Sequence, residues 1–207
     1  MNRKLHTRDP RGAFFDERAA AWEENCYPPE TRTRLRELIP YFSVRPCSAV
    51  LDLGAGTGVL APYLRDMLTA EGLLVSLDIS FEMARHAAMK AGYGKGCVIQ
   101  ATAMRLPLRD ASMDTAVCFA AFPHFEDKLT ALQEIFRVLR PGGNVVVAHL
   151  LSREELSRHH GGHSAVAGDK LPDDGGMCSL FRAASFPKPE IINIPGRYIA
   201  SSVKEKP

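Results

Sequence analysis

The chain has 207 residues, of which 45% are hydrophobic and 24% are charged, and its formal net charge is +2 at pH 7. This length and composition suit one domain with a buried core, and the small net charge does not require a nucleic-acid or membrane partner. No segment approaches the ~18 to 20 consecutive apolar residues of a membrane span, and the N-terminus lacks the apolar stretch of a signal peptide, so we expect a cytoplasmic protein.

The N-terminal segment, residues 1–45, is expected to form a helical cap. Phe14, Phe15 and Trp22 recur at helical spacing, which indicates one or two helices packed outside a sheet. Together with Tyr27 they supply more aromatic surface than a detached tail would need. We therefore expect this segment to cover the ligand cleft as a lid, with ordinary packing on the flank of the sheet as the alternative. Phe15 and Tyr27 would then contact the substrate.

Residues 46–150 are expected to form the cofactor-binding core. Apolar runs rich in Val, Ile and Leu alternate there with segments of helical periodicity, which is the pattern of βαβ units. The expected strands are 48–53, 72–78, 95–100, 113–119 and 143–149. Near-continuous apolar runs of this kind suit a parallel sheet that is covered on both faces. Before the last strand, Asp127 to Leu139 place apolar side chains on one helical face, and Pro141-Gly142-Gly143 is expected to end that helix.

The rest of the chain divides into two parts. Residues 151–187 are expected to form an insertion on the substrate side, which begins with a helix because Ser152 and Glu155 fit a capping box. Residues 188–207 contain two β-rich runs that flank Pro195-Gly196, so we expect an antiparallel hairpin followed by a short tail. The whole chain is therefore predicted to be a single α/β domain.

A glycine-rich turn is the most informative local feature. The stretch VLDLGAGTG, residues 50–58, places three glycines at alternate positions directly after an apolar run. Such a turn between a parallel strand and a helix lets a ligand lie against bare backbone at the carboxyl edge of a sheet. Residues 56–61 also fit the GxGxxA fingerprint of dinucleotide binding, and Asp78 follows at about the expected ~20 residues. With a dinucleotide or with another nucleoside cofactor, Asp78 would accept hydrogen bonds from ribose hydroxyls. The turn alone therefore does not decide which cofactor binds.

Four segments in order resemble the motifs of class I S-adenosylmethionine-dependent methyltransferases. They read VLDLGAGTG, LDISFEM at residues 77–83, LPLRDASMDTAVC and LRPGG. The resemblance implies a doubly wound, mostly parallel, seven-stranded Rossmann-like sheet whose reversed last strand lies in the C-terminal hairpin. It also implies transfer of a methyl group from S-adenosylmethionine to an acceptor. Because no nucleic-acid-binding domain is added to the chain, a small-molecule acceptor is favoured.

The resemblance further implies which residues hold S-adenosylmethionine. These are Asp52, Gly54, Ala55, Gly56, Asp78, Ile79, Met83, Ala103, Met104 and Phe119. The glycine turn would lie against the methionine and ribose parts, Asp52 would help to orient the amino group, and Asp78 would bind the ribose hydroxyls. Thr102 stands where many members carry an aspartate that accepts a hydrogen bond from the adenine amino group. That contact is therefore expected to be weaker or to be made by the backbone.

Histidines near strand ends are the candidates for proton transfer. A general base matters when the acceptor is a hydroxyl or a protonated nitrogen, and a histidine pKa of ~6.5 suits that role. His149 ends the fifth expected strand and is expected to orient or deprotonate the acceptor, with His124, after the fourth strand, as the alternative base. His160 is expected to fold back over the same opening and contact the substrate.

No metal site is predicted, although possible ligands follow the fifth strand. They are His149, His159, His160, His163 and Asp169, and their spacing fits no recognised zinc signature. Three of the five cysteines, Cys26, Cys118 and Cys178, would hold a metalloid substrate only if their thiolates converged, so packing is the favoured role.

Two other functions stay open at this point. An NAD-dependent oxidoreductase would satisfy the glycine fingerprint, but the chain offers no evident substrate domain with hydride-transfer residues. A non-catalytic module that binds a cofactor or a metal would keep the fold without turnover. We expect a monomer or a homodimer.

Overall fold

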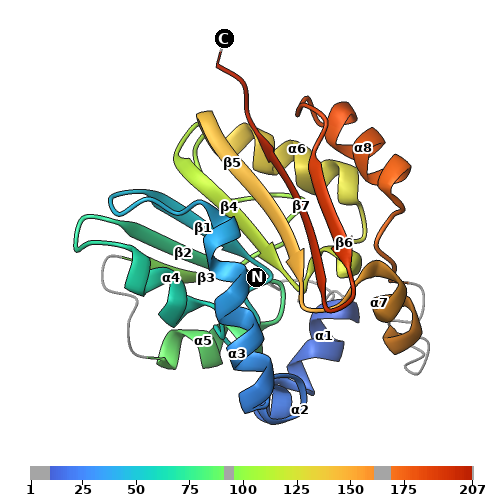
Figure 1. Ribbon diagram of the computed structural model, residues 1–207. Helices are drawn as coiled ribbons and strands as arrows, with labels where there is room; N and C mark the ends of the chain where they lie inside the picture. Colours follow the sequence, from blue (N-terminus) through green and yellow to red (C-terminus); the bar gives the residue numbers. More distant parts are fainter. Residues whose placement is uncertain (1–9, 91–95, 161–168, 207) are drawn as a thin grey trace, which may run out of the picture.

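The computed structural model describes residues 10–90, 96–160 and 169–206, with the backbone alone for residues 159 and 160. Within these residues seven strands form one sheet in the order β3-β2-β1-β4-β5-β7-β6 (Figure 1). The strands are β1 (Ala49–Leu53), β2 (Leu73–Asp78), β3 (Gly96–Gln100), β4 (Met113–Phe119), β5 (Leu139–His149), β6 (Glu190–Ile194) and β7 (Arg197–Val203). The first five are parallel, whereas β7 is antiparallel to β5 and β6. The predicted α/β sheet with a C-terminal hairpin is therefore confirmed.

Helices cover both faces of this sheet. The α-helices are α1 (Pro10–Asp16), α2 (Trp22–Cys26), α3 (Pro29–Leu38), α4 (Ala61–Met67), α5 (Phe81–Met89), α6 (Lys128–Val138), α7 (Arg153–His160) and α8 (Asp174–Ala183). On one face Val50 and Val117 pack with side chains of α3 and α4, and on the other Leu51 and Ala116 pack with α6 and α8. Successive residues of a strand point to opposite faces of the sheet, so continuous apolar strands fit a sheet whose two faces are both buried.

The N-terminal cap differs from the expected one or two helices. Three α-helices, α1 to α3, are joined by 3₁₀ turns at Ala19–Ala21 and Ile39–Phe42. Pro28 is extended and Pro29 opens α3, which fits the preference of proline for the first helical position. Figure 1 shows α1 and α2 at the end of the sheet toward which β5 runs. The cap is therefore bent, with α3 on a face of the sheet and α1 and α2 near its carboxyl edge.

The crossover helix ends close to the predicted residue, but the strand after it begins at Leu139 and not at residue 143 as expected. Helix α6 ends at Val138, and Pro141-Gly142-Gly143 lies inside the long strand β5. Gly142 has φ +81° and its N–H donates to the Lys204 carbonyl at 2.7 Å, so the segment pairs with the end of the chain. The Lys204 ammonium donates to the carbonyls of Phe136 and Leu139, at 2.7 and 2.8 Å. A cation thus satisfies backbone acceptors where the helix ends.

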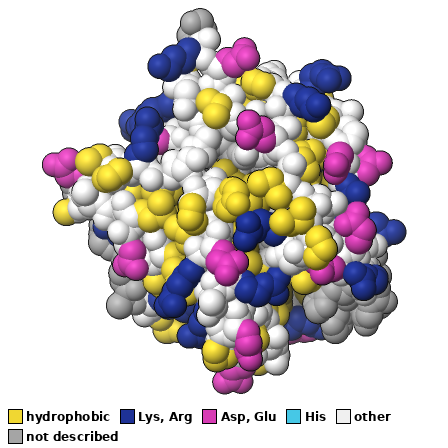
Figure 2. Space-filling model, in the orientation of Figure 1, with side chains coloured by type: hydrophobic (Ala, Val, Ile, Leu, Met, Phe, Trp, Pro, Cys, Tyr) yellow, Lys and Arg dark blue, Asp and Glu magenta, His cyan; other side chains and the backbone are white. Residues whose placement is uncertain are grey.

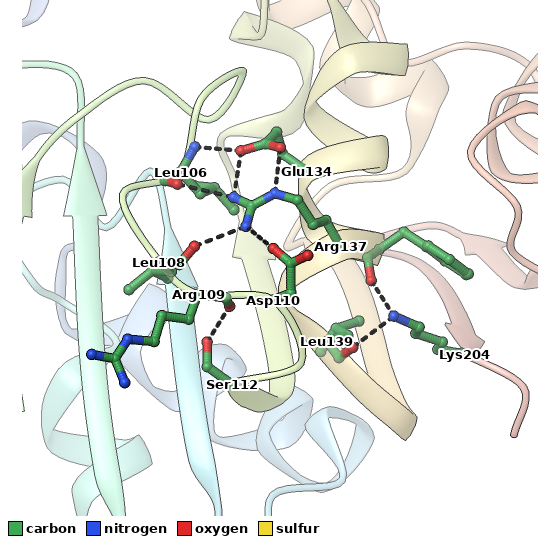
Figure 3. Close-up of polar contacts among 10 residues, drawn as sticks. Leu106, Leu108, Arg109, Asp110, Ser112, Glu134, Arg137, Leu139 and Lys204 are labelled. Atoms are coloured by element: carbon green, nitrogen blue, oxygen red, sulfur yellow. Dashed lines mark hydrogen bonds and ion pairs between the residues drawn. The ribbon is translucent and has the colours of Figure 1, made fainter.

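A charged network fixes the loop between β3 and β4 onto α6 (Figure 3). The Arg137 guanidinium donates to Glu134 at 2.7 and 2.8 Å, to Asp110 at 2.6 Å, and to the carbonyls of Leu106 and Leu108 at 3.0 and 2.8 Å. Glu134 in turn accepts from the Leu106 N–H at 2.7 Å. We call this set the Arg137 network. It holds the loop whose other end reaches the candidate site.

The surface carries both apolar and charged side chains. Figure 2 shows hydrophobic side chains across the middle of one face, with charged side chains around them. Apolar atoms make up more than half of most folded surfaces, so this band alone does not indicate a binding site. Among the described residues, no helix combines the length and apolar character needed to cross a membrane, and the longest, α6, has 11 residues.

Candidate active site

A cavity opens at the carboxyl ends of β1, β2 and β4 and holds about 910 Å³ of atom-free space, part of it open to solvent. Its walls include all ten residues that were expected to hold the cofactor. The cap adds Arg11, Phe15, Trp22 and Tyr27, and the segment after β4 adds Ala120, Ala121, His124, Phe125 and Glu126. The carboxyl edge of a parallel sheet is where ligands bind in such folds.

The three glycines of the turn all adopt the left-handed backbone, but they serve different needs. A Cβ on Gly54, where φ is +66°, would lie 2.3 Å from the Ala121 Cβ, so this glycine lets the turn pack on the segment after β4. A Cβ on Gly56, where φ is +55°, would have the Trp22 Nε1 atom as its nearest neighbour, at 3.7 Å. A Cβ on Gly56 would thus touch Trp22 without a clash, and the Gly56 backbone lines the cavity, where a ligand could approach it.

Two buried carboxylates face this space. Asp78 accepts hydrogen bonds from the Gly56 and Ser80 N–H groups at 2.8 and 2.9 Å, and the Ser76 hydroxyl lies 3.5 Å from Asp52. Burial, and after it the nearby Asp78 charge, together raise the pKa of Asp52 to about 7. Burial also raises the pKa of Asp78 to about 6, although its backbone hydrogen bonds oppose the shift. A cation or hydroxyl donors in the cavity would stabilise both charges.

The N-terminal cap is fastened over the cavity by polar contacts. Asp16 accepts from the Ser80 hydroxyl at 2.6 Å and from the Glu82 N–H at 3.0 Å, at the start of α5. Glu23 accepts from the Thr57 hydroxyl at 2.8 Å and pairs with Lys90. The segment expected to act as a lid therefore lies over the cleft, and its motion stays a prediction.

His124 forms a polar cluster at the other end of the cavity. It closes the 3₁₀ turn Phe122–His124 after β4, and its Nδ1 atom lies 2.8 Å from the Asp169 carboxylate. Arg11 donates to the His124 carbonyl at 2.7 Å and lies 3.5 Å from the other Asp169 oxygen. The Phe15 ring meets the imidazole edge to face, with 5.4 Å between ring centroids. A histidine held by a carboxylate is suited to proton transfer.

His149 lies elsewhere. It is only 2% exposed, pairs with Tyr198 across β5 and β7, and is not among the described residues that line the cavity. The antiparallel partner strand covers this end of β5, so the end of a strand was not a sufficient sign of access. The structure thus places His124 in the wall of the cavity and His149 outside it, contrary to what was expected of His149.

Part of the histidine-rich segment after β5 lies outside the described residues. The side chains of His159 and His160, and all of His163, lie outside the described residues. Within the described residues, no group of three or more His, Cys, Asp or Glu side chains could hold a metal ion. The predicted capping box is confirmed, since the Ser152 N–H donates to Glu155 at 2.7 Å and the Glu155 N–H donates to the Ser152 hydroxyl at 3.2 Å.

Two site residues lacked a signal in the sequence. Arg11 lies 113 positions before His124, and Asp169, considered above only as a metal ligand, lies 45 positions after it. Nothing in local periodicity joins residues so far apart. Helix patterns and strand ends can place a residue near the sheet edge, but they cannot pair side chains from the cap, the β4 loop and the insertion.

The sequence of the chain is similar to those of known methyltransferases. Residues 51–147 match the family described as "Methyltransferase domain". The chain is similar to the ubiquinone/menaquinone biosynthesis C-methyltransferase UbiE of Wigglesworthia glossinidia brevipalpis, with 32% identity over 110 residues, which are 51% of this chain and 44% of that protein. It is also similar to the O-methyltransferase resE of Aspergillus sclerotiorum, with 33% identity over 138 residues, which are 63% and 52% of the two chains. The chain thus spans about half the length of these relatives.

A solved structure extends the likeness to most of the chain. A methyltransferase from Aquifex aeolicus, described as SAM dependent, superposes with a TM-score of 0.73 and 19% identity, over 89% of this chain and 97% of that one. At this identity the superposition bears on the fold alone. The fold therefore agrees with that of a known methyltransferase.

Proposed function

This chain belongs to the class I S-adenosylmethionine-dependent methyltransferases, and from that premise we propose that it transfers a methyl group from S-adenosylmethionine to a small molecule bound in the cavity. One observation carries the proposal. The glycine turn leaves bare backbone beside two buried carboxylates, Asp52 and Asp78, at the carboxyl edge of the sheet. Backbone space, acceptors for hydroxyls and negative charge for a cation are what this methyl donor requires.

The residues of the cavity fit the parts of S-adenosylmethionine. Asp78 would accept from the ribose hydroxyls, and Asp52 would attract the positive charge of the methionine part. The apolar side chains of Ile79, Met83 and Met104 would enclose the adenine. The donor supplies an already activated methyl group, so the main task of the protein is to hold the acceptor in line with it.

The same geometry disfavours the dinucleotide alternative. A dinucleotide places its pyrophosphate on a helix N-terminus directly after the glycine turn, yet α4 begins only at Ala61. Asp52 lies one residue before the end of β1, which the turn follows, and would oppose a pyrophosphate there. S-adenosylmethionine carries a positive charge on its sulfur, so Asp52 would attract it and not repel it.

The acceptor side of the proposal centres on His124. It lines the cavity, together with Phe15 and Tyr27, which were expected to contact the substrate. We assign the role of general base to His124 in preference to His149, which is buried against Tyr198. The proposed contact of His160 with substrate rests on the sequence alone.

Calorimetry with S-adenosylmethionine, S-adenosylhomocysteine and NAD tests the cofactor. We expect the first two to bind and Asp78→Ala to weaken both about 10- to 100-fold, because lost hydrogen bonds to a buried charge cost about 1 to 3 kcal/mol. Gly56→Val should weaken binding, because it puts a branched side chain on a left-handed backbone that lines the cavity. Asp66→Asn, an exposed carboxylate on α4, is the matched control and should bind normally. Binding of NAD alone, or normal affinity in a folded Asp78→Ala variant, would contradict the proposal.

A further inference from the structure

Tyr27 of the N-terminal cap lies in the wall of the cavity, in the region where the Asp52 charge acts. We propose that the Tyr27 hydroxyl donates a hydrogen bond to the carboxylate of the methionine part of S-adenosylmethionine, so that the site selects a methyl donor with a complete amino-acid end. This inference rests on the proposed function, because it takes the methyl donor as given. It goes beyond it by naming a specificity-determining residue in the cap and the ligand group that this residue recognises.

The hydroxyl of Tyr27 is a buried polar group that awaits a partner. Tyr27 lines the cavity and is 9% exposed, yet its hydroxyl makes no hydrogen bond among the residues that the structure describes. Buried polar groups of folded proteins are nearly always hydrogen-bonded, because an unpaired group loses its contacts with water and gains nothing in return. A ligand in the cavity can supply the acceptor that the protein does not.

The neighbours of Tyr27 constrain its position within the cap. The Tyr27 N–H donates to the Glu23 carbonyl at 2.8 Å where α2 ends, and Pro28 and Pro29 follow directly. A proline disfavours the helical conformation in the residue before it, which fits the end of α2 at this point. The Tyr27 ring packs with Phe119, the last residue of β4, with 6.1 Å between the ring centroids. Backbone and ring contacts therefore both hold this side chain at the cavity.

The surroundings of Tyr27 make its hydroxyl a hydrogen-bond donor. Burial, and after it the charges of acidic groups that include Asp52, raise the pKa of this hydroxyl. It therefore stays protonated at neutral pH and can donate. A hydrogen bond to a carboxylate is charge-assisted and about twice as strong as one to a neutral acceptor. Tyr27 is thus suited to an anionic group of the ligand.

The methionine part of the donor carries such an anionic group. Its α-carbon bears an ammonium, which Asp52 would attract, and a carboxylate, which the Asp52 charge would repel. The carboxylate therefore needs hydrogen-bond donors close to Asp52. The backbone N–H groups of residues 54–56 already donate to the Leu77 carbonyl or to Asp78, at 2.8 to 3.0 Å. Tyr27 offers a side-chain donor in the region where the Asp52 charge acts.

Three ligands that differ only at the amino-acid end test this contact. They are S-adenosylhomocysteine, its decarboxylated analogue, and its deaminated analogue, which keeps the carboxylate. Calorimetry on the full chain measures their affinities, and the emission of Trp22, the only tryptophan of the chain, reports that each ligand enters the cavity that Trp22 lines. We expect Tyr27→Phe to weaken S-adenosylhomocysteine and the deaminated analogue about 10- to 100-fold, and to leave the affinity for the decarboxylated analogue unchanged.

Control variants separate recognition from structure. Tyr41→Phe removes the hydroxyl of an exposed tyrosine that bonds to Arg197 and is not among the described residues that line the cavity, so all three affinities should stay unchanged. Asp52→Asn should show the reverse pattern, weakening the two ligands that keep the ammonium and leaving the deaminated analogue bound at least as tightly. Because the Tyr27 hydroxyl makes no hydrogen bond within the described part of the chain, Tyr27→Phe should not lower the free energy of unfolding without ligand.

The outcomes keep this inference apart from the proposed function. Normal affinity for S-adenosylhomocysteine in a folded Tyr27→Phe variant would show that Tyr27 does not meet the carboxylate. An equal loss of affinity for the decarboxylated analogue would show the same, because that ligand has no carboxylate to lose. In both cases methyl transfer would still stand. A parent chain that binds neither S-adenosylmethionine nor S-adenosylhomocysteine would overturn the proposed function itself.

Discussion

Glu134 in the Arg137 network and Asp52 at the cavity are both carboxylates within the fold, but their surroundings differ. Hydrogen bonds from Arg137 lower the pKa of Glu134, whereas burial and the charge of Asp78 raise the pKa of Asp52 to about 7. The first carboxylate has a cation as its partner (Figure 3), and the second has another carboxylate as its neighbour. In the Arg137 network a negative charge is thus paired with a positive one. In the cavity two carboxylates lie close together, and a cationic ligand would neutralise their charge.

Removing the cation of the Arg137 network should have the largest effect on stability. Arg137→Leu removes the guanidinium that donates to Glu134, Asp110 and two loop carbonyls, so the free energy of unfolding should fall by about 2 to 3 kcal/mol. Because Arg137 is partly exposed, the cost stays below that of a fully buried pair. Thermal and urea unfolding measure it. Arg140→Leu, which breaks the more exposed pair with Asp114, should cost less than ~1 kcal/mol. An equal loss of unfolding free energy in Arg137→Leu and Arg140→Leu would show that the Arg137 network is no more stabilising than a single exposed ion pair.

Removing the charge of Asp52 should act in the opposite direction. Asp52→Asn takes away a charge that burial disfavours, so we expect the ligand-free chain to gain about 1 to 2 kcal/mol at pH 8. Its affinity for S-adenosylmethionine should fall about tenfold, because a charge opposite the donor cation is lost. Unfolding and calorimetry on the same preparation check both signs. A variant that is both less stable and normal in binding would break the comparison.

The two regions should also respond to pH with opposite signs. The folded chain keeps protons on Asp52 and Asp78 that the unfolded chain releases near pH 4, so the free energy of unfolding from this pair falls as pH rises from about 4 to 7. Glu134 has a lowered pKa, so its contribution is lost only as the pH falls below about 4.5. Stabilisation by S-adenosylmethionine should increase between pH 5 and 7.5 as the two aspartates ionise. A ligand-induced shift that is independent of pH would show that neither charge meets the donor.

The smallest expected effect concerns the lid. Its contacts are individually modest, so opening needs little free energy and should show in hydrogen exchange. Residues 10–27 should gain protection when S-adenosylhomocysteine binds, and Glu23→Gln should reduce that gain by weakening the contacts with Thr57 and Lys90. Backbone amides of α6, far from the lid in sequence and on a face of the sheet, serve as the internal reference. Equal exchange with and without ligand would leave the cap as static packing.

Much of the fold and the cofactor end could be predicted because their signals are local. Alternating apolar runs predicted the strands, and one short turn with Asp78 at the next strand end predicted the edge of the sheet where the cavity opens. The early start of β5 at Leu139 was missed because Pro141-Gly142-Gly143 pairs with the end of the chain, a contact that local rules do not contain.

The acceptor end depended on contacts between distant segments. His149 and His124 looked alike in the sequence, since both lie near strand ends, and only the pairing of β5 with β7 buries one of them. The joining of His124 to Asp169 and Arg11 needs the cap, the β4 loop and the insertion together. Long-range tertiary contacts decide such a cluster, and a single sequence does not reveal them.

The cap connects both ends of the cavity, and this has a kinetic consequence. Glu23 touches the glycine turn through Thr57, while Arg11 of the same segment reaches His124 and Asp169. The predicted opening of the cap would therefore uncover both ends of the cavity together, and both products of the proposed transfer would leave in the same event. We expect a rapid first turnover followed by a slower steady state that is set by reopening. Rapid-quench measurements would then show a burst whose amplitude counts the active chains, and the steady rate would rise in Glu23→Gln.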